Sequence, residues 1–261
     1  MLKRVVVMIL IIIGLICGLI ASILGAGSSM LVVPLLEYVY PSLVGESLTV
    51  QTITSAALVL TLFSTGAATV RHHFAKRIPY KKVIFYVLFG SIGSFLSSMF
   101  LAEHVNQLVF LSLFLFIAII SLTFNLIPFR KPNIAPNQRL SMIFGMGLMF
   151  FLGVVTGVIG VGGMILIIPY MVYVLHYSLK TTIAITTFTG VFISLFAIIA
   201  RIPSGSMDWE FAILLGVGGL IGGLIAPSLS AKIPDAILKL SLNTLLFIII
   251  MTVIVDLISI I

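Results

Sequence analysis

Apolar segments long enough to cross a lipid bilayer recur along this whole chain. About 20 apolar residues span a bilayer core, and lipid offers no partner for a free backbone amide or carbonyl, so such segments form helices. The sequence therefore predicts an all-α polytopic membrane protein of about eight transmembrane helices. The expected segments are 5–24 with an interrupted extension to 40, 48–70, 83–102, 108–127, 140–175 with an interruption, 182–199, 211–229 and 237–261.

The composition restricts where function can lie. Only 8% of the residues are charged and 61% are hydrophobic, whereas a soluble domain has about 25% charged residues. These values exclude a water-soluble enzyme, and the short connections leave no room for an extramembrane domain. The net charge of +7 does not indicate nucleic acid as a partner, because most basic residues lie in connections, where they orient spans in the bilayer.

The distribution of Lys and Arg predicts the orientation of an eight-span chain. Cytoplasmic loops are rich in these residues, and the split is most uneven if both termini are cytoplasmic. Eleven of the 14 basic residues are then inside, and three, Lys180, Lys232 and Lys239, are outside. The inside set is Lys3, Arg4, Arg71, Lys76, Arg77, Lys81, Lys82, Arg130, Lys131, Arg139 and Arg201.

An internal repeat divides the chain into two halves. Residues 18–34 align without gaps on residues 153–169 at an offset of 135, with glycines and proline in register. Further matches follow at offsets of 131 and 129, the latter pairing Tyr80 with Trp209. We expect homologous four-helix repeats over 1–127 and 140–261, joined by a proline-containing cytoplasmic linker over 128–139. An even number of spans per half makes the repeats parallel, and an extra crossing by the interrupted segments makes them inverted.

The first segment of each half is too long for one helix. Residues 5–40 would extend about 54 Å as a helix, against a bilayer core of about 30 Å. Glycine clusters followed by Pro34 or Pro169 mark the expected breaks, which expose backbone N–H groups and a positive helix dipole suited to an anion. Close helix packing is the alternative role for these glycines. The candidate anion-binding residues are Gly25, Gly27, Ser28 and Ser29, and Gly160, Gly162 and Gly163.

Polar residues at helical spacing follow each predicted break. At the offset of 131, Gln51 pairs with Thr182 and Ser55 with Thr186, so we add these four residues to the candidate binding site. Hydroxyls within helices also bond to their own carbonyls, which is the structural alternative. The polar residues over 71–77 are expected to form a solvated cytoplasmic loop.

Catalytic and metal-binding motifs are not found in the sequence. It has no metalloprotease, nucleophile-elbow or phosphate-loop motif, and its single cysteine, Cys17, gives no ligand pattern. We expect no enzyme, no cofactor and no metal.

The duplicated glycine motif resembles that of a known family. A pattern of the type Gly-x-Gly-Gly-Gly-x-Leu-x-Val-Pro, early in each of two four-helix halves, is similar to the sulfite exporter TauE/SafE family of bacterial membrane permeases. Ser28-Ser29 and Met164 replace glycines of that pattern. The resemblance implies a multi-pass protein of the bacterial inner membrane that carries sulfite, a sulfonate or a related sulfur-containing or carboxylate anion. The coupling ion, proton or sodium, is left open, and a non-transporting membrane scaffold is the alternative function.

Overall fold

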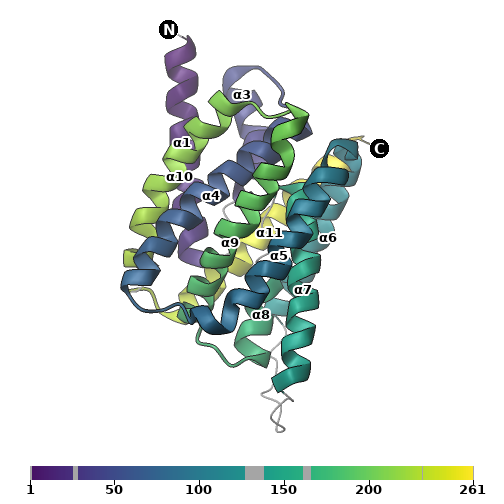
Figure 1. Cartoon of the computed structure of the whole chain (residues 1–261). Helices are drawn as coiled ribbons and strands as arrows, with labels where there is room; N and C mark the ends of the chain where they lie inside the picture. The colour runs from purple at the N-terminus through teal and green to yellow at the C-terminus, as the bar shows by residue number, and fades with distance from the viewer. Residues whose placement is uncertain (1, 26–28, 127–137, 161–165, 231, 261) are drawn as a thin grey trace.

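The computed structural model describes residues 2–25, 29–126, 138–160, 166–230 and 232–260, and over these ranges it is helical without strands (Figure 1). Eight of the described helices are long and apolar enough to cross a membrane. They are α1 (Leu2–Leu24), α4 (Val50–Phe74), α5 (Tyr80–Phe100), α6 (Gln107–Leu126), α7 (Gln138–Ile159), α9 (Leu179–Arg201), α10 (Trp209–Ser230) and α11 (Asp235–Ile260).

Short helical pieces follow α1 and α7. The first set comprises α2 (Ser29–Pro34), the π-helix η1 (Leu35–Val39) and α3 (Tyr40–Val44), and the second comprises α8 (Ile167–Pro169) and η4 (Tyr170–Val174), also a π-helix. Each π-helix starts directly after a proline, Pro34 or Pro169. Proline has no N–H to donate, so the hydrogen-bonding register changes there. The two π-helices are separated by the same offset of 135 as the glycine motifs.

Helices α4 and α9 form the centre of the bundle. About 72% of the most apolar window of α4 and 67% of that of α9 are buried, compared with 50% or less in the other six spans. Gly190 contacts Thr65, while Arg201 bonds to Thr54, so the two helices run antiparallel. The N-terminus of α4, capped by the Thr49 side chain, and that of α9, capped by Ser178, therefore lie at opposite ends of the molecule, as Figure 1 shows.

Glycine contacts fix the directions of the helices around this centre. Helix α10 runs parallel to α1, since Gly14 and Gly18 meet its backbone at Leu215 and Gly219. It also runs parallel to α4, which its glycines contact successively from Gly216 to Gly223. On the other side, α5 runs parallel to α7, through contacts of their glycines and serines. Because 75–79 turn the chain back between α4 and α5, the α5–α7 pair is antiparallel to α1, α4 and α10.

The two predicted halves consequently face opposite ways. The matched helices α1 and α7 run in opposite directions, as do α4 and α9. The expected parallel arrangement of the two halves is wrong for this fold. The short pieces after α1 return the chain to the end of the molecule where α1 began, and those after α7 return it to the end where α7 began. Two close glycine contacts occupy matched positions, Gly18 with Gly219 and Gly153 with Gly90, at the offsets of 135 and 129 read from the sequence.

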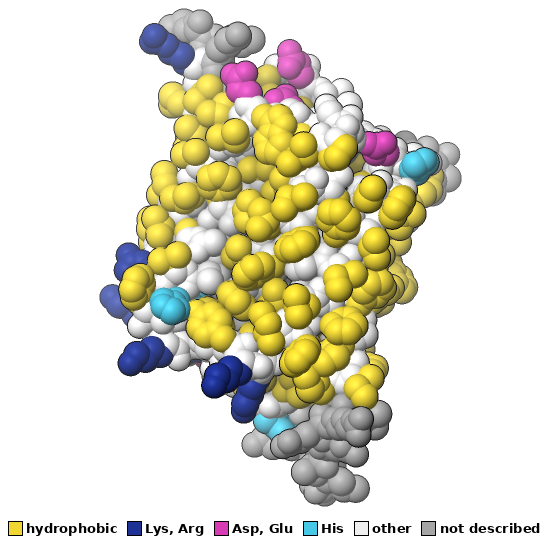
Figure 2. Space-filling view, viewed as in Figure 1, with side chains coloured by type: hydrophobic (Ala, Val, Ile, Leu, Met, Phe, Trp, Pro, Cys, Tyr) yellow, Lys and Arg dark blue, Asp and Glu magenta, His cyan; other side chains and the backbone are white. Residues whose placement is uncertain are grey.

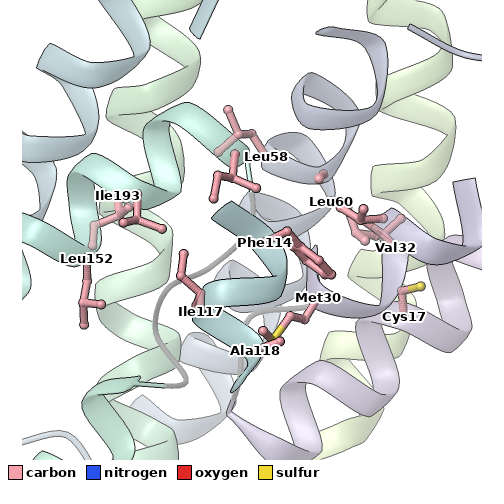
Figure 3. Close-up of a cluster of buried hydrophobic side chains, with 14 of the residues drawn as sticks. Cys17, Met30, Val32, Leu58, Leu60, Phe114, Ile117, Ala118, Leu152 and Ile193 are labelled. Carbon is pink, nitrogen blue, oxygen red and sulfur yellow. The ribbon is translucent and has the colours of Figure 1, made fainter. Parts of the chain in front are cut away.

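The first returning piece is enclosed by protein. Met30 and Val32 of α2 are buried, and Figure 3 shows them among side chains of α1, α4 and α6, including Cys17, Leu60 and Phe114. Helix ends at bilayer depth are tolerated where protein surrounds them. This packing supplies that environment for α2.

Charge separates the two ends of the molecule (Figure 2). We call the end with the α4–α5 loop the basic end, and the end with the α9–α10 loop the acidic end. Figure 1 shows both termini at the acidic end, so the expectation that they share a side with the 71–82 loop is wrong. Basic residues described at the basic end are Arg71, Lys76, Arg77, Lys81, Lys82, Lys180, Lys232 and Lys239, and acidic residues at the acidic end are Glu37, Glu46, Glu103, Asp208, Glu210 and Asp256. The exceptions among the described residues are Asp235 at the basic end and Arg4 and Arg201 at the acidic end.

This topology can be tested with single cysteines in a Cys17→Ala background. We predict that an impermeant maleimide added to intact cells labels Ser204→Cys, at the acidic end, and leaves Ala75→Cys, at the basic end, unlabelled. Both positions are exposed, and both should react after permeabilisation. The direction follows from the preference of basic loops for the cytoplasm. Labelling of both cysteines from the same side would contradict the fold.

The α5–α7 contact predicts a strong effect of one added methyl group. A Cβ atom at Gly153 would overlap the carbonyl oxygen of Gly90, whereas a Cβ at Gly147 on the same helix meets nothing within 4 Å. We predict that Gly153→Ala destabilises the protein by about 1–3 kcal/mol. Gly147→Ala should leave stability unchanged or slightly raised, because alanine favours helix. Thermal unfolding in detergent measures both, and equal melting temperatures would contradict the contact.

Candidate functional site

A buried arginine lies where three helices meet near the acidic end. Arg201 is the last residue of α9, and its side chain, only 4% exposed, lies against the start of α4 and the end of α7. The sequence suggested a cytoplasmic loop residue at this position. That interpretation is wrong, because α9 continues to Arg201 and brings its side chain into the bundle.

Neutral groups hold the guanidinium on both sides. Nη1 donates to Thr54 Oγ1 at 2.7 Å and to Ser55 Oγ at 3.3 Å. Nη2 donates to the carbonyl oxygens of Gly157 at 2.7 Å and Val158 at 3.2 Å. These carbonyls belong to the last turn of α7, where helix carbonyls lack partners within the helix and the dipole is negative. The arginine thus caps α7 and links it to α4.

The positive charge has no carboxylate partner among the described residues. Glu103 is near enough to interact with it through space but forms no ion pair with it. The buried Nε atom also has no hydrogen-bond acceptor in the described part of the chain. A cation within a membrane bundle is costly and is usually paired. Arg201 therefore offers a net positive charge and a free donor to an anion.

One end of the site is closed by a glycine with a left-handed backbone. Gly160 follows α7 and has a φ of 71°, and a Cβ there would overlap the backbone of Thr54. No other residue fits this combination of backbone angle and contact without strain. Gly160 thereby lets the end of α7 approach the start of α4, where Arg201 binds.

The glycine after α1 has the same conformation. Gly25 has a φ of 68°, and a Cβ there would lie 2.9 Å from Ile183 and from Thr186 Oγ1. Each of these glycines therefore contacts a central helix of the other half of the chain. The first lies against α9 and the second against α4.

The structure brings the predicted polar residues onto the two central helices. Ser55 is buried and bonds to Arg201, while Gln51 is half-buried in the first turn of α4. Thr186 donates to the carbonyl of Ile183 in its own helix at 2.9 Å. Thr182 is fully buried, and its hydroxyl has no partner among the described residues. Gly27, Ser28, Gly162, Gly163 and the side chain of Ser29 lie outside the described part of the chain.

Sequence reasoning missed two buried nitrogen-bearing side chains. Arg201 and His72 were both assigned to solvated connections because each lies next to a loop. The sequence does relate the two residues, because His72 and Arg201 are 129 residues apart. The same offset pairs Tyr80 with Trp209, so the two residues occupy matched positions in the two halves. His72 is only 1% exposed, so the expected solvated loop at 71–77 is wrong at this residue.

Other features of the described chain do not suit an anion. A groove of about 300 Å³ between α6, α7 and η4 is lined by apolar and tyrosine side chains and has no charged lining residue. The described residues contain no cluster of three His, Cys, Asp or Glu side chains that could hold a metal ion.

Eight apolar helices around a polar centre with a buried cation define a multi-pass membrane protein of the transporter class. The chain belongs to the sulfite exporter TauE/SafE family, whose model matches residues 10–253. It is 24% identical to the probable membrane transporter protein YunE of Bacillus subtilis (strain 168), over 92% of this chain and 94% of that protein. No solved structure matches the chain.

The bond between Thr54 and Arg201 predicts a difference between two buried threonines of α4. Thr54→Val removes an acceptor from the guanidinium and should lower the stability by about 1.5–3 kcal/mol, as for hydrogen bonds to charged groups. Thr65→Val is the control, because the Thr65 hydroxyl donates to the carbonyl of Thr61 in its own helix at 2.6 Å. The melting temperature should fall further for Thr54→Val. An equal fall in both variants would show that Thr54 does not hold Arg201.

Proposed function

We propose that the protein is a secondary transporter, a permease, for a small anion. The observation that carries this proposal is the Arg201 guanidinium, which is buried in the bundle without a carboxylate partner. Its four hydrogen bonds go to neutral oxygens, which stabilise the cation without neutralising it. An anion beside Nε would supply the missing charge and acceptor together.

The family supports the chemical class of the substrate. Its description as a sulfite exporter favours sulfite, a sulfonate or a related sulfur-containing or carboxylate anion. Such anions are compact and present several acceptor oxygens, which suits a guanidinium whose donors lie in one plane. The absence of nucleotide-binding motifs from the sequence favours transport driven by gradients over transport driven by ATP.

We further propose that 1–127 and 140–261 are inverted repeats joined by the linker 128–139. The opposite directions of matched helices, the matched glycine contacts and the two prolines followed by π-helices support this proposal. In transporters with inverted repeats the substrate site lies at the interface between repeats, and one repeat moves against the other. Arg201 lies at that interface, because it joins α9 of the second half to α4 of the first.

The remaining candidate residues are proposed to line the anion path beside Arg201 and at the start of α9, near the basic end. Ser55 bonds to Arg201, and Gly160 contacts Thr54 beside it. Gln51 lies in the first turn of α4, Thr182 and Thr186 lie on α9, and Gly25 contacts Thr186. The full proposed set is Gly25, Gly27, Ser28, Ser29, Gln51, Ser55, Gly160, Gly162, Gly163, Thr182 and Thr186, with Arg201 added.

The charge distribution supports an orientation in the bacterial inner membrane. We propose that the basic end faces the cytoplasm, because basic loops are retained there. In this fold both termini then face outward, in place of the cytoplasmic termini expected from the sequence. The linker, which joins α6 to α7, belongs to the cytoplasmic side in both arrangements.

Transport by reconstituted protein tests the proposal. Purified protein in liposomes at pH 8 should take up radiolabelled sulfite with saturation, and Arg201→Met should reduce uptake to the background of empty liposomes. Arg201→Lys keeps the charge but loses the planar set of donors, so its KM should rise at least about tenfold. Arg4→Lys, an exposed position at the same end, is the matched control and should transport normally.

A structural role alone makes a different prediction for Arg201. If the protein is a non-transporting scaffold and Arg201 serves only as a helix cap, the wild type should show no saturable uptake. Sulfite should also fail to raise its melting temperature, since a ligand stabilises only a state that it binds. Saturable uptake that survives in Arg201→Met would place the anion elsewhere in the bundle.

A further inference from the structure

We propose that His72 is the proton-binding residue of the transport cycle and forms a second anion site with Thr69 and Thr182 near the basic end. This inference rests on the proposed function and deepens it. The site takes a small oxyanion together with one proton, whereas the site at Arg201 takes the anion alone.

The position of His72 in the bundle mirrors that of Arg201. Each lies near the end of a central helix, His72 on α4 and Arg201 on α9, and these helices run antiparallel. The contacts of Thr65 with Gly190 and of Thr54 with Arg201 fix their register. Continued toward the basic end, this register brings the α4 face that holds Thr69 and His72 to the start of α9. Thr182 and Thr186 lie there, on the side that Gly25 contacts.

Buried polar atoms without partners are found on both central helices toward this end. Neither ring nitrogen of His72 has a hydrogen-bond partner among the described residues, and the same holds for the buried hydroxyl oxygens of Thr69 and Thr182. Buried polar groups are bonded in the great majority of cases. An oxyanion can accept from a protonated imidazole and from both hydroxyls at once. The arrangement is thus complementary to an anion.

The charges around His72 couple the proton to the anion. Helices α10 and α2 have no charged or titratable side chain near this end, α1 has Cys17, and α9 has Lys180. On α4 itself the neighbours are Arg71 and His73, and in the following loop the amide of Arg77 donates to the His72 carbonyl at 3.1 Å. Arg71, Arg77 and Lys180 are cationic, and Asp235, at the start of α11, is the acidic residue described at this end. With a buried ring and Arg77 close by, a proton on His72 is disfavoured until an anion arrives. Binding of either ligand therefore strengthens binding of the other.

The chemistry of one cycle is a reversible protonation. The imidazole gains a proton from the solution on one side and forms an N–H bond as the anion binds. It loses that proton to the solution on the other side as the anion leaves. One anion and one proton move in the same direction, and the anion's own bonds are unchanged. At Arg201 the charge is permanent, so no proton is exchanged there.

Accumulation driven by a pH gradient tests this role. Liposomes contain equal concentrations of anion inside and outside, with the membrane potential clamped at zero. Two labelled probes are used, methanesulfonate and sulfite. Methanesulfonate does not titrate between about pH 6 and 8, the range in which a histidine side chain changes its charge. A gradient of about one pH unit should drive accumulation of up to about tenfold in the wild type, the limit for one proton per anion.

Two substitutions at His72 and one beside it complete the design. His72→Gln cannot titrate and should equilibrate label slowly without accumulating it. His72→Lys keeps a positive charge without needing a proton in this range, so it should also fail to accumulate label, which keeps the test valid if the Gln variant does not insert. His73→Gln is the matched control, because His73 is exposed and its Nδ1 lies 2.7 Å from the Tyr80 hydroxyl oxygen. It should accumulate label as the wild type does.

The outcomes separate the two proposals. Equilibration without accumulation in the wild type, or accumulation that persists in the His72 variants, overturns the role of His72 and leaves the permease standing. If the wild type equilibrates neither anion, the proposed function falls and the role of His72 falls with it. Accumulation in the wild type and in His73→Gln, lost in the His72 variants, supports the inference.

Discussion

Two helices that end inside the bundle are the constraint on which the rest of this structure depends. Each end leaves backbone carbonyls that lipid cannot satisfy, so protein groups must surround and bond to them. At the end of α7, Arg201 supplies the bonds, and Gly160 lets the chain approach α4 closely enough for Thr54 and Ser55 to take part. The polar centre of the bundle is thus a requirement of the fold before it is a site for a ligand.

Small residues are the second consequence of this arrangement. The central helices bring polar groups together only if the outer helices pack at close range, and Gly18, Gly90, Gly153 and Gly219 allow backbone to touch backbone there. Lipid supplies no hydrophobic force between helices, so close packing of this kind holds membrane bundles together. The glycines that pack helices together therefore lie within long helices. The described glycines with a proposed binding role, Gly25 and Gly160, lie at helix ends.

Much of the fold could be predicted from the sequence, because long apolar runs admit one kind of structure in lipid. The eight spans agree with the described helices to within a few residues at most ends, and the family was identified from the paired glycine motifs. The directions of the halves could not be obtained this way, since a short returning piece and a full crossing have similar apolar sequences. The charge count had the same weakness, because Lys180 and Lys232 change sides when the direction of the chain changes. Arg201 and His72 were missed because a basic residue next to a loop has the same local sequence whether its side chain is buried or solvated.

Because the matched helices α4 and α9 run in opposite directions, His72 and Arg201 lie at corresponding positions near opposite ends of the bundle. A symmetric duplication would place identical groups at both ends of the central helices, and anion binding would then be alike from either side. This chain has a permanent cation at one end and a titratable ring at the other. For the proposed anion substrate, affinity would therefore depend on pH near the basic end and not near the acidic end. Because coupling between two ligands is reciprocal, such a difference lets a proton gradient give a direction to anion movement.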